Sequence, residues 1–85
     1  MKLYDYHGKY NCSGARICDR RKELKLSQEQ LAAKLQLAGL EISQRAISRV
    51  ENGLRVVPDF ELKYFADALE VSPLWLLGCH DKADG

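Results

Sequence analysis

The chain has 85 residues and a formal net charge of +1, and 46% of its residues are hydrophobic. This length suits a single domain, the apolar content argues against a disordered chain, and no apolar run is long enough to span a membrane. The first ten residues lack the apolar core and the cleavage site of a signal peptide, so we expect a cytoplasmic protein.

Turn and helix signals along the chain predict an all-α domain with two flanking segments. Residues 1–13 are expected to form an N-terminal arm, and residues 79–85 a polar tail. Over residues 14–78, apolar residues recur at helical spacing and are interrupted by glycine, serine and proline. This pattern predicts five helices, over residues 14–25, 28–38, 44–51, 58–70 and 73–77.

Serine and proline mark the starts of four of these helices. Ser27 is a strong N-cap with Gln30 at the capping-box position three residues later, and Ser43 caps the next helix. Pro58 and the Ser-Pro pair at residues 72–73 suit the starts of the last two helices, because the first turn of a helix tolerates proline. Two short helices joined by a turn therefore occupy the middle of the chain.

The predicted helix over residues 44–51 has a polar face that suits DNA. Ile47 and Val50 fall on its apolar side, and the polar side chains follow at spacings of one, three and four residues: Gln44, Arg45, Ser48 and Arg49. Arginine pairs with guanine, and glutamine with adenine, through two hydrogen bonds in a major groove. These four side chains are therefore the predicted base-reading residues, with a solvated surface charge as the alternative for Arg49.

Charge is distributed unevenly along the chain. Residues 1–55 contain 11 Lys and Arg against 6 Asp and Glu, which gives +5. Residues 56–85 contain two Lys and Arg against six Asp and Glu, which gives −4. Because the basic part contains the polar helix face, this asymmetry suits a protein with one surface directed at phosphates.

Three motifs, LSQEQLAAKL, SQRAISRVENG and VPDFELKYFADALEVSPLWLL, occur in this order over most of residues 14–78. Together they resemble the lambda-repressor-like, Cro-type helix-turn-helix family of phage and bacterial regulators. The resemblance implies a compact five-helix fold that acts as a dimer on a double-stranded DNA operator. It also implies that the helix over residues 44–51 lies in the major groove, with Gln44, Arg45 and Arg49 facing the bases.

The resemblance implies roles for residues outside that helix face. Gln28 would contact a phosphate at the start of its helix, where free N–H groups favour an anion, and an ordinary first-turn residue is the alternative. The backbone of Asn52 and Gly53 would lie near another phosphate. Arg21 would pair with Glu51 and so tie the first helix to the end of the third.

Two segments depart from the family pattern. The link between the second and third helices is longer than the usual tight turn, and its apolar residues predict that it extends the second helix and packs: Leu37, Leu40 and Ile42. The connector after the third helix, Leu-Arg-Val-Val, has one basic residue where relatives often have several. That residue, Arg55, is the expected phosphate contact there, and the salt dependence of DNA binding should be shallower than in relatives with more basic connectors.

The N-terminal arm has a loose pattern in which tyrosines alternate with polar residues. This pattern predicts a short strand or a packed arm, and an arm that reaches DNA is the alternative. Packing is favoured because the arm has only Lys2 and Lys9 against Asp5.

The last predicted helix has more apolar residues than one inner face needs. Trp75 is expected in the core. Leu74 and Leu77 are the predicted dimer seam, because a surplus of exposed apolar side chains marks an interaction surface. Plain core packing of the apolar residues of this helix is the alternative.

The cysteines and histidines match no recognised metal-binding spacing. Reduced, unpaired cysteines are expected, and a zinc site is the minor alternative, from Cys12, Cys18, Cys79, His7 and His80. No catalytic set, Gly-rich phosphate loop or cofactor motif occurs. We therefore expect no enzyme, metal, cofactor or small-molecule ligand.

These features predict a sequence-specific transcriptional regulator, a phage-like or bacterial repressor, that binds operator DNA as a homodimer. An antitoxin or a protein-interaction module on the same fold is the alternative. An adjacent toxin gene would favour this alternative.

Overall fold

The computed structural model describes residues 3–79, which form five helices and no strand. The helices are α1 (Gly14–Glu23), α2 (Gln28–Leu37), α3 (Gln44–Glu51), α4 (Asp59–Leu69) and α5 (Pro73–Leu76). The predicted all-α, five-helix fold is confirmed, and no helix end differs by more than two residues from the prediction. Most of the expected polar tail lies outside the described residues. In the described part, no helix has the length and apolar character that a membrane crossing requires.

Side-chain caps define where α2 and α3 begin. Ser27 Oγ accepts a hydrogen bond from the Gln30 N–H at 3.0 Å, and Gln30 Oε1 accepts one from the Ser27 N–H at 2.8 Å, which completes the predicted capping box. Ser43 Oγ accepts from the Ala46 N–H at 3.1 Å at the start of α3. The caps therefore satisfy backbone N–H groups that have no partner within the first turn of each helix.

The link between α2 and α3 packs, but it does not extend α2 as predicted. The chain turns at Gly39, whose φ of 109° is readily adopted only by glycine. The Leu40 N–H then donates to the Leu35 carbonyl at 2.9 Å, a hydrogen bond typical of a helix C-terminus. Leu40 and Ile42 are buried as expected, whereas Leu37 is exposed.

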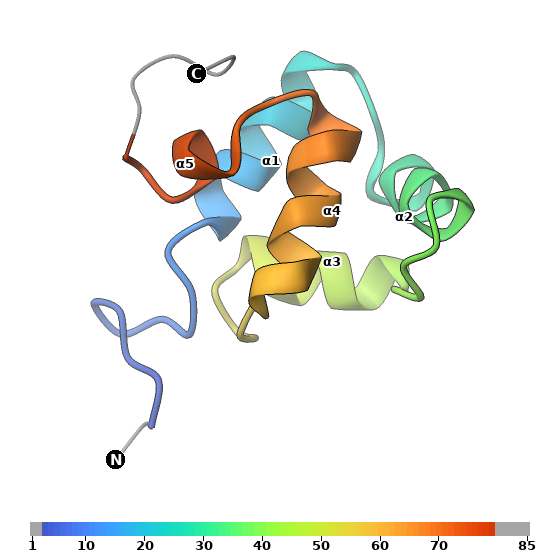
Figure 1. The fold of residues 1–85 in the computed structure, drawn as a ribbon. Helices are drawn as coiled ribbons and strands as arrows, with labels where there is room; N and C mark the ends of the chain where they lie inside the picture. Colours follow the sequence, from blue (N-terminus) through green and yellow to red (C-terminus); the bar gives the residue numbers. More distant parts are fainter. Residues whose placement is uncertain (1–2, 80–85) are drawn as a thin grey trace.

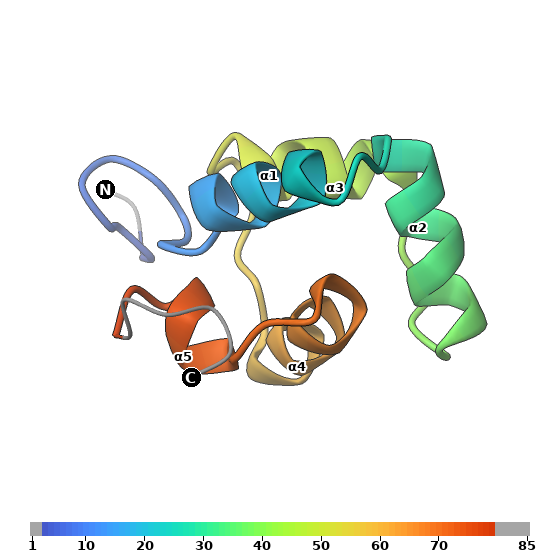
Figure 2. The same ribbon diagram turned by 90° about the horizontal axis from the view of Figure 1, so that it is seen from above.

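All five helices contribute to one core. In Figure 2, α1 and α3 lie on one side, α4 and α5 lie on the other, and α2 stands across one end; Figure 1 shows the same arrangement turned by 90°. Burying one large apolar side chain contributes about 1.5–3 kcal/mol. These fully buried side chains hold the outward face of α3 in place: Ile17, Leu31, Leu35, Ile47, Val50, Phe65, Leu69 and Leu76.

The N-terminal arm packs at its inner end, and its described residues, 3–13, form no strand. Tyr6 and Lys9 make an isolated bridge around a tight turn, and Tyr4 and Tyr6 are exposed. The Tyr10 N–H donates to the Gly53 carbonyl at 2.9 Å, which places the arm beside the end of α3.

The contact between α1 and α3 leaves no room for a side chain at Gly14. A Cβ at this position would collide with the Val50 carbonyl oxygen. We expect Gly14→Ala to lower the free energy of unfolding by about 1–3 kcal/mol, because the two helices must move apart. Urea unfolding measures this loss. The matched control is Ala15→Ser at an exposed position, and equal stability of Gly14→Ala and wild type would contradict the close approach.

Candidate nucleic-acid interface

The polar side of α3 faces solvent. Gln44, Arg45 and Arg49 are exposed and Ser48 is half-buried, so the four predicted base-reading residues share one helix surface. Within residues 3–79, the Arg45 side chain makes no hydrogen bond or ion pair. Its guanidinium is therefore available to a ligand.

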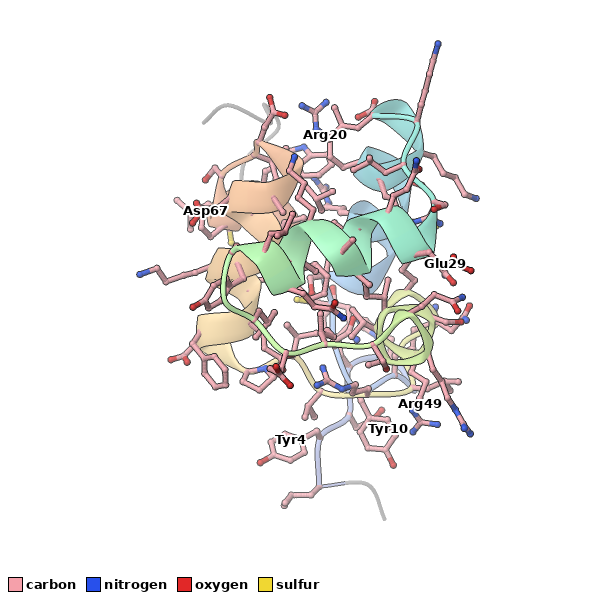
Figure 3. The ribbon with its side chains drawn as sticks, turned by 90° about the vertical axis from the view of Figure 1, so that its right-hand side faces the viewer. Tyr4, Tyr10, Arg20, Glu29, Arg49 and Asp67 are labelled. Carbon is pink, nitrogen blue, oxygen red and sulfur yellow. The ribbon has the colours of Figure 1, made fainter. Side chains whose placement is uncertain are left out.

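The start of α2 lies on the same side of the molecule as this surface. In Figure 3, Glu29 of α2 and Arg49 of α3 lie on one side, and Asp67 of α4 lies on the opposite side. Among the described residues, no group accepts a hydrogen bond from the backbone N–H of Gln28 or Glu29. Two free N–H groups at a helix N-terminus suit an anion such as a phosphate.

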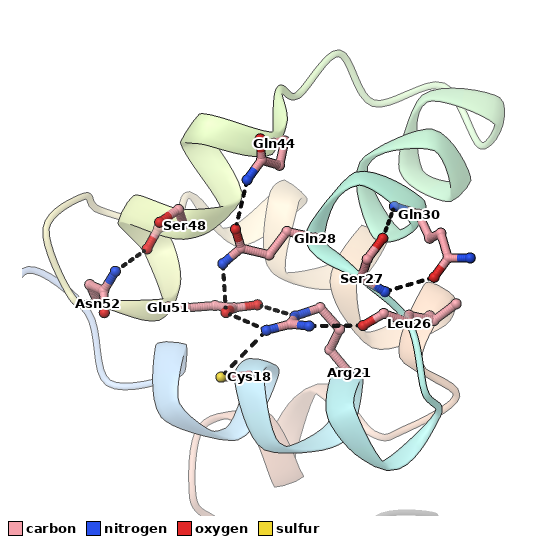
Figure 4. Close-up of polar contacts among 10 residues, drawn as sticks. All are labelled: Cys18, Arg21, Leu26, Ser27, Gln28, Gln30, Gln44, Ser48, Glu51 and Asn52. Atoms are coloured by element: carbon pink, nitrogen blue, oxygen red, sulfur yellow. Dashed lines mark hydrogen bonds and ion pairs between the residues drawn. The ribbon is translucent and has the colours of Figure 1, made fainter.

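A chain of hydrogen bonds connects α3 to α2 and α1 (Figure 4). Gln44 Nε2 donates to Gln28 Oε1 at 2.9 Å, and Gln28 Nε2 donates to Glu51 Oε1 at 3.1 Å. Glu51 also accepts two hydrogen bonds from Arg21, at 2.7 and 3.0 Å. Gln28 therefore binds both the first and the last residue of α3.

The Arg21–Glu51 pair is the ion pair that the resemblance implies, and it is nearly buried, with side chains 11% and 5% exposed. Burial raises the pKa of Glu51, but hydrogen bonds from Arg21 and Gln28 outweigh this effect and hold the pKa below its ordinary value. The hydrogen bond with Glu51 raises the pKa of Arg21 despite its burial. Arg21 also donates to the Leu26 carbonyl at 2.8 Å, so the charge is well satisfied.

The Gln28 side chain is engaged inside the protein by this network. Its amide oxygen accepts from Gln44, and its amide nitrogen donates to Glu51. The phosphate contact expected of Gln28 stays a prediction, and the group best placed to make it is the free backbone N–H.

The arm covers much of the C-terminal end of α3. Asn52 is exposed, and its Nδ2 donates to the Ser48 carbonyl at 2.9 Å. Gly53 is buried, its N–H donates to the Val50 carbonyl at 3.0 Å, and the side chain of Lys9 lies over it. The Gly53 backbone, predicted to lie near a phosphate, has no free group in this structure. Asn52 keeps an exposed amide.

Arg55, the predicted phosphate contact of the connector, is paired inside the protein. Its Nη1 and Nη2 donate to the Glu61 carboxylate at 2.6 and 3.0 Å, and Glu61 is buried. The hydrogen bond with Glu61 raises the pKa of Arg55. From the sequence, Arg55 was expected to bind a phosphate, and this pair with Glu61 was not predicted. A phosphate would have to compete with a buried carboxylate for Arg55.

The predicted dimer residues lie on the surface. Leu74 is 46% exposed and Leu77 is 43% exposed, whereas Leu76 is fully buried. Trp75 packs partly against the core, with the Arg16 guanidinium 5.1 Å from its ring centre. Trp75 therefore faces inward as expected, and the two leucines are exposed.

The cysteines are free thiols in this structure, with Cys12 and Cys79 exposed. In the described part of the chain, no three His, Cys, Asp or Glu side chains are grouped so that they could hold a metal ion. His80, a member of the alternative zinc set, lies outside the described residues.

Glu51→Ala leaves a buried arginine without its partner. We expect it to lower the free energy of unfolding by about 2 kcal/mol or more. Because folding lowers the Glu51 pKa, its contribution is complete above the ordinary pKa of 4.5 and is lost as the pH falls through the lower folded value. The difference between Glu51→Ala and wild type should therefore shrink at acidic pH.

Urea unfolding at neutral and acidic pH tests this expectation. The control is Glu23→Ala, since Glu23 is exposed and pairs with Arg20 only at 3.4 Å, so its loss should change little. An unchanged unfolding midpoint for Glu51→Ala would show that the buried pair does not stabilise the fold.

Comparison with known proteins agrees with this geometry. A family model described as helix-turn-helix (HTH_3) matches residues 19–76, more than half of the chain. Comparison with curated proteins finds no match. The matched family consists of DNA-binding domains that are typically non-enzymatic. The chain therefore belongs to the HTH_3 family of Cro/C1-type, lambda-repressor-like helix-turn-helix proteins.

Proposed function

We propose that this protein is a sequence-specific transcriptional regulator, a phage-like or bacterial repressor, that places α3 in the major groove of operator DNA. The observation that carries the proposal is the exposed polar row of α3 beside the free N–H groups at the start of α2. A major groove about 12 Å wide admits one α-helix. The protein would act in the cytoplasm, where bacterial DNA lies, and the proposal requires no cofactor or small-molecule ligand.

Base reading is assigned to the outward face of α3. Arg45 has a free guanidinium that can donate two hydrogen bonds to guanine. Gln44 suits adenine, and its contact with Gln28 limits its freedom before DNA binds, which lowers the entropic cost of binding. Ser48 and Arg49 complete the row; Arg49 also donates to the Leu54 carbonyl at 3.2 Å.

Phosphate binding is assigned to groups beside that face. The backbone N–H groups of Gln28 and Glu29 suit one phosphate, because the positive end of the helix dipole favours an anion. The exposed Asn52 amide suits another. Such contacts position the protein on the duplex but carry no base information.

Arg45→Ala tests base reading. It should cost about 1–3 kcal/mol of binding to the selected operator and relax base preference at one position of each half-site. Selection of bound sequences from a random duplex pool, followed by affinity titration of wild type and variant, measures both effects.

The matched control for this experiment is Lys63→Ala, because Lys63 is an exposed cation one helical turn from Asp67 on α4. Its selected sequences should equal those of wild type. An equal loss for Arg45→Ala on operator and random duplex would contradict base reading by Arg45.

We also propose that two copies bind the operator through the exposed leucines of the α5 region. One eight-residue helix reads only a few base pairs, too few to identify one site in a genome. A two-fold dimer doubles the site and places half-sites about one helical turn of DNA apart. Leu74 and Leu77 supply uncovered apolar surface for the seam.

Leu74→Glu should weaken this dimer, because a charge would be buried at the seam. Sedimentation with and without operator compares the masses of wild type and variant. A wild-type protein that stays monomeric in both conditions and selects one unrepeated half-site would contradict the proposed dimer. A dimer that Leu74→Glu leaves intact would place the seam elsewhere.

A further inference from the structure

Residues 5–10 of the arm form a tight turn with a defined backbone. The Tyr6 N–H donates to the Lys9 carbonyl at 2.6 Å, and the Lys9 N–H donates to the Tyr6 carbonyl at 3.0 Å. His7 and Gly8 have φ values of 51° and 87°, the signs of a type I′ hairpin turn. Asp5 Oδ1 accepts from the Gly8 N–H at 2.8 Å. The Lys9 side chain therefore extends from an ordered backbone.

This turn is attached to the end of α3. Besides the backbone hydrogen bond to Gly53, Asn11 Nδ2 donates to the carbonyls of Val50 and Arg55 at 3.1 and 2.8 Å. The β, γ and δ carbons of Lys9 cover Gly53 so closely that a Cβ there would lie within 2.9 Å of each. The aliphatic part of Lys9 thus occupies the helix end where a phosphate contact was expected from the Gly53 backbone.

Lys9 carries an uncompensated positive charge at this junction. Arg55, the cation of the connector, is neutralised by the buried Glu61. Lys9 is exposed, and none of residues 3–79 forms an ion pair with its ammonium group. A free ammonium beside a DNA-reading helix suits a phosphate, to which it binds as a point charge.

The arm and the start of α2 lie at opposite ends of α3 (Figure 2). An eight-residue helix is about 12 Å long, close to the width of the major groove. We propose that Lys9 binds a backbone phosphate of the DNA at the C-terminal end of α3, across the groove from the phosphate at the start of α2. The arm would then replace the connector as the phosphate-binding segment, so this inference rests on the proposed function.

The test uses the full chain and a duplex selected by wild type, titrated over a range of salt concentrations. Lys9→Met keeps an aliphatic side chain over Gly53 and removes the charge, and Lys9→Arg keeps the charge. For Lys9→Met, the slope of log affinity against log salt concentration should become shallower by about 0.9. The loss of affinity relative to wild type should therefore be about threefold larger at roughly 50 mM salt than at roughly 200 mM salt. Lys9→Arg should retain the wild-type slope.

Two further measurements separate a phosphate contact from other roles. Lys9→Met should lose the same factor on operator and on random duplex and select the same sequences as wild type, because phosphates carry no base information. The control variant Lys63→Met should match wild type in slope and affinity.

Three results would overturn the inference. A wild-type slope and affinity for Lys9→Met would show that Lys9 contacts no phosphate, while a loss for Arg45→Ala in the same assay would leave the proposed function standing. A changed consensus for Lys9→Met would assign Lys9 to base reading. A wild type that binds no duplex would remove the proposed function and this inference together.

Discussion

The buried ion pair between Arg21 and Glu51 holds together the three helices that build the candidate interface. Arg21 belongs to α1, Glu51 is the last residue of α3, and Gln28 of α2 donates to the same carboxylate. Any movement of α3 that separates the pair leaves a charge without its partner in a water-poor environment, which is costly. Because Gln28 also accepts from Gln44 at the other end of α3, the same network positions the first of the proposed base-reading residues. The ion pair therefore positions the candidate DNA-binding surface without being part of it.

Internal pairing also decides which positive charges are available to a ligand. The first 55 residues carry an excess of basic residues, but several of these cations bind groups of the protein. Arg55 binds Glu61, Arg20 Nε donates to the Leu69 carbonyl at 2.9 Å, and Lys34 Nζ donates to the Ala68 carbonyl at 2.6 Å. A count of charges along the chain thus overestimates the charge that faces a phosphate. The DNA contacts proposed above use the cations of α3 and of the arm, whose charges have no carboxylate partner among the described residues.

Packing and DNA contact are compatible roles for the arm. Its inner end is held by hydrogen bonds from Tyr10 and Asn11 to the end of α3 and to the connector. These bonds order the turn that precedes them, and an ordered turn presents Lys9 with less loss of conformational entropy than a free arm would. Lys9 covers Gly53 at the end of α3, where the resemblance implied a phosphate contact. Its own ammonium group is the proposed replacement for that contact.

The sequence by itself determined the helices, their caps and the two faces of α3, because these features depend on residues three or four positions apart. The spacing of Ser27 and Gln30 was enough to predict the capping box, and the resemblance to known regulators was enough to imply the Arg21–Glu51 pair. Only the tertiary structure decided that Arg55 pairs with Glu61 and that Lys9 lies over Gly53. These contacts join separate elements, and each depends on where the arm and the connector cross the end of α3. The position of that crossing follows from the packing of the whole core. The spacing of residues along the sequence does not predict it.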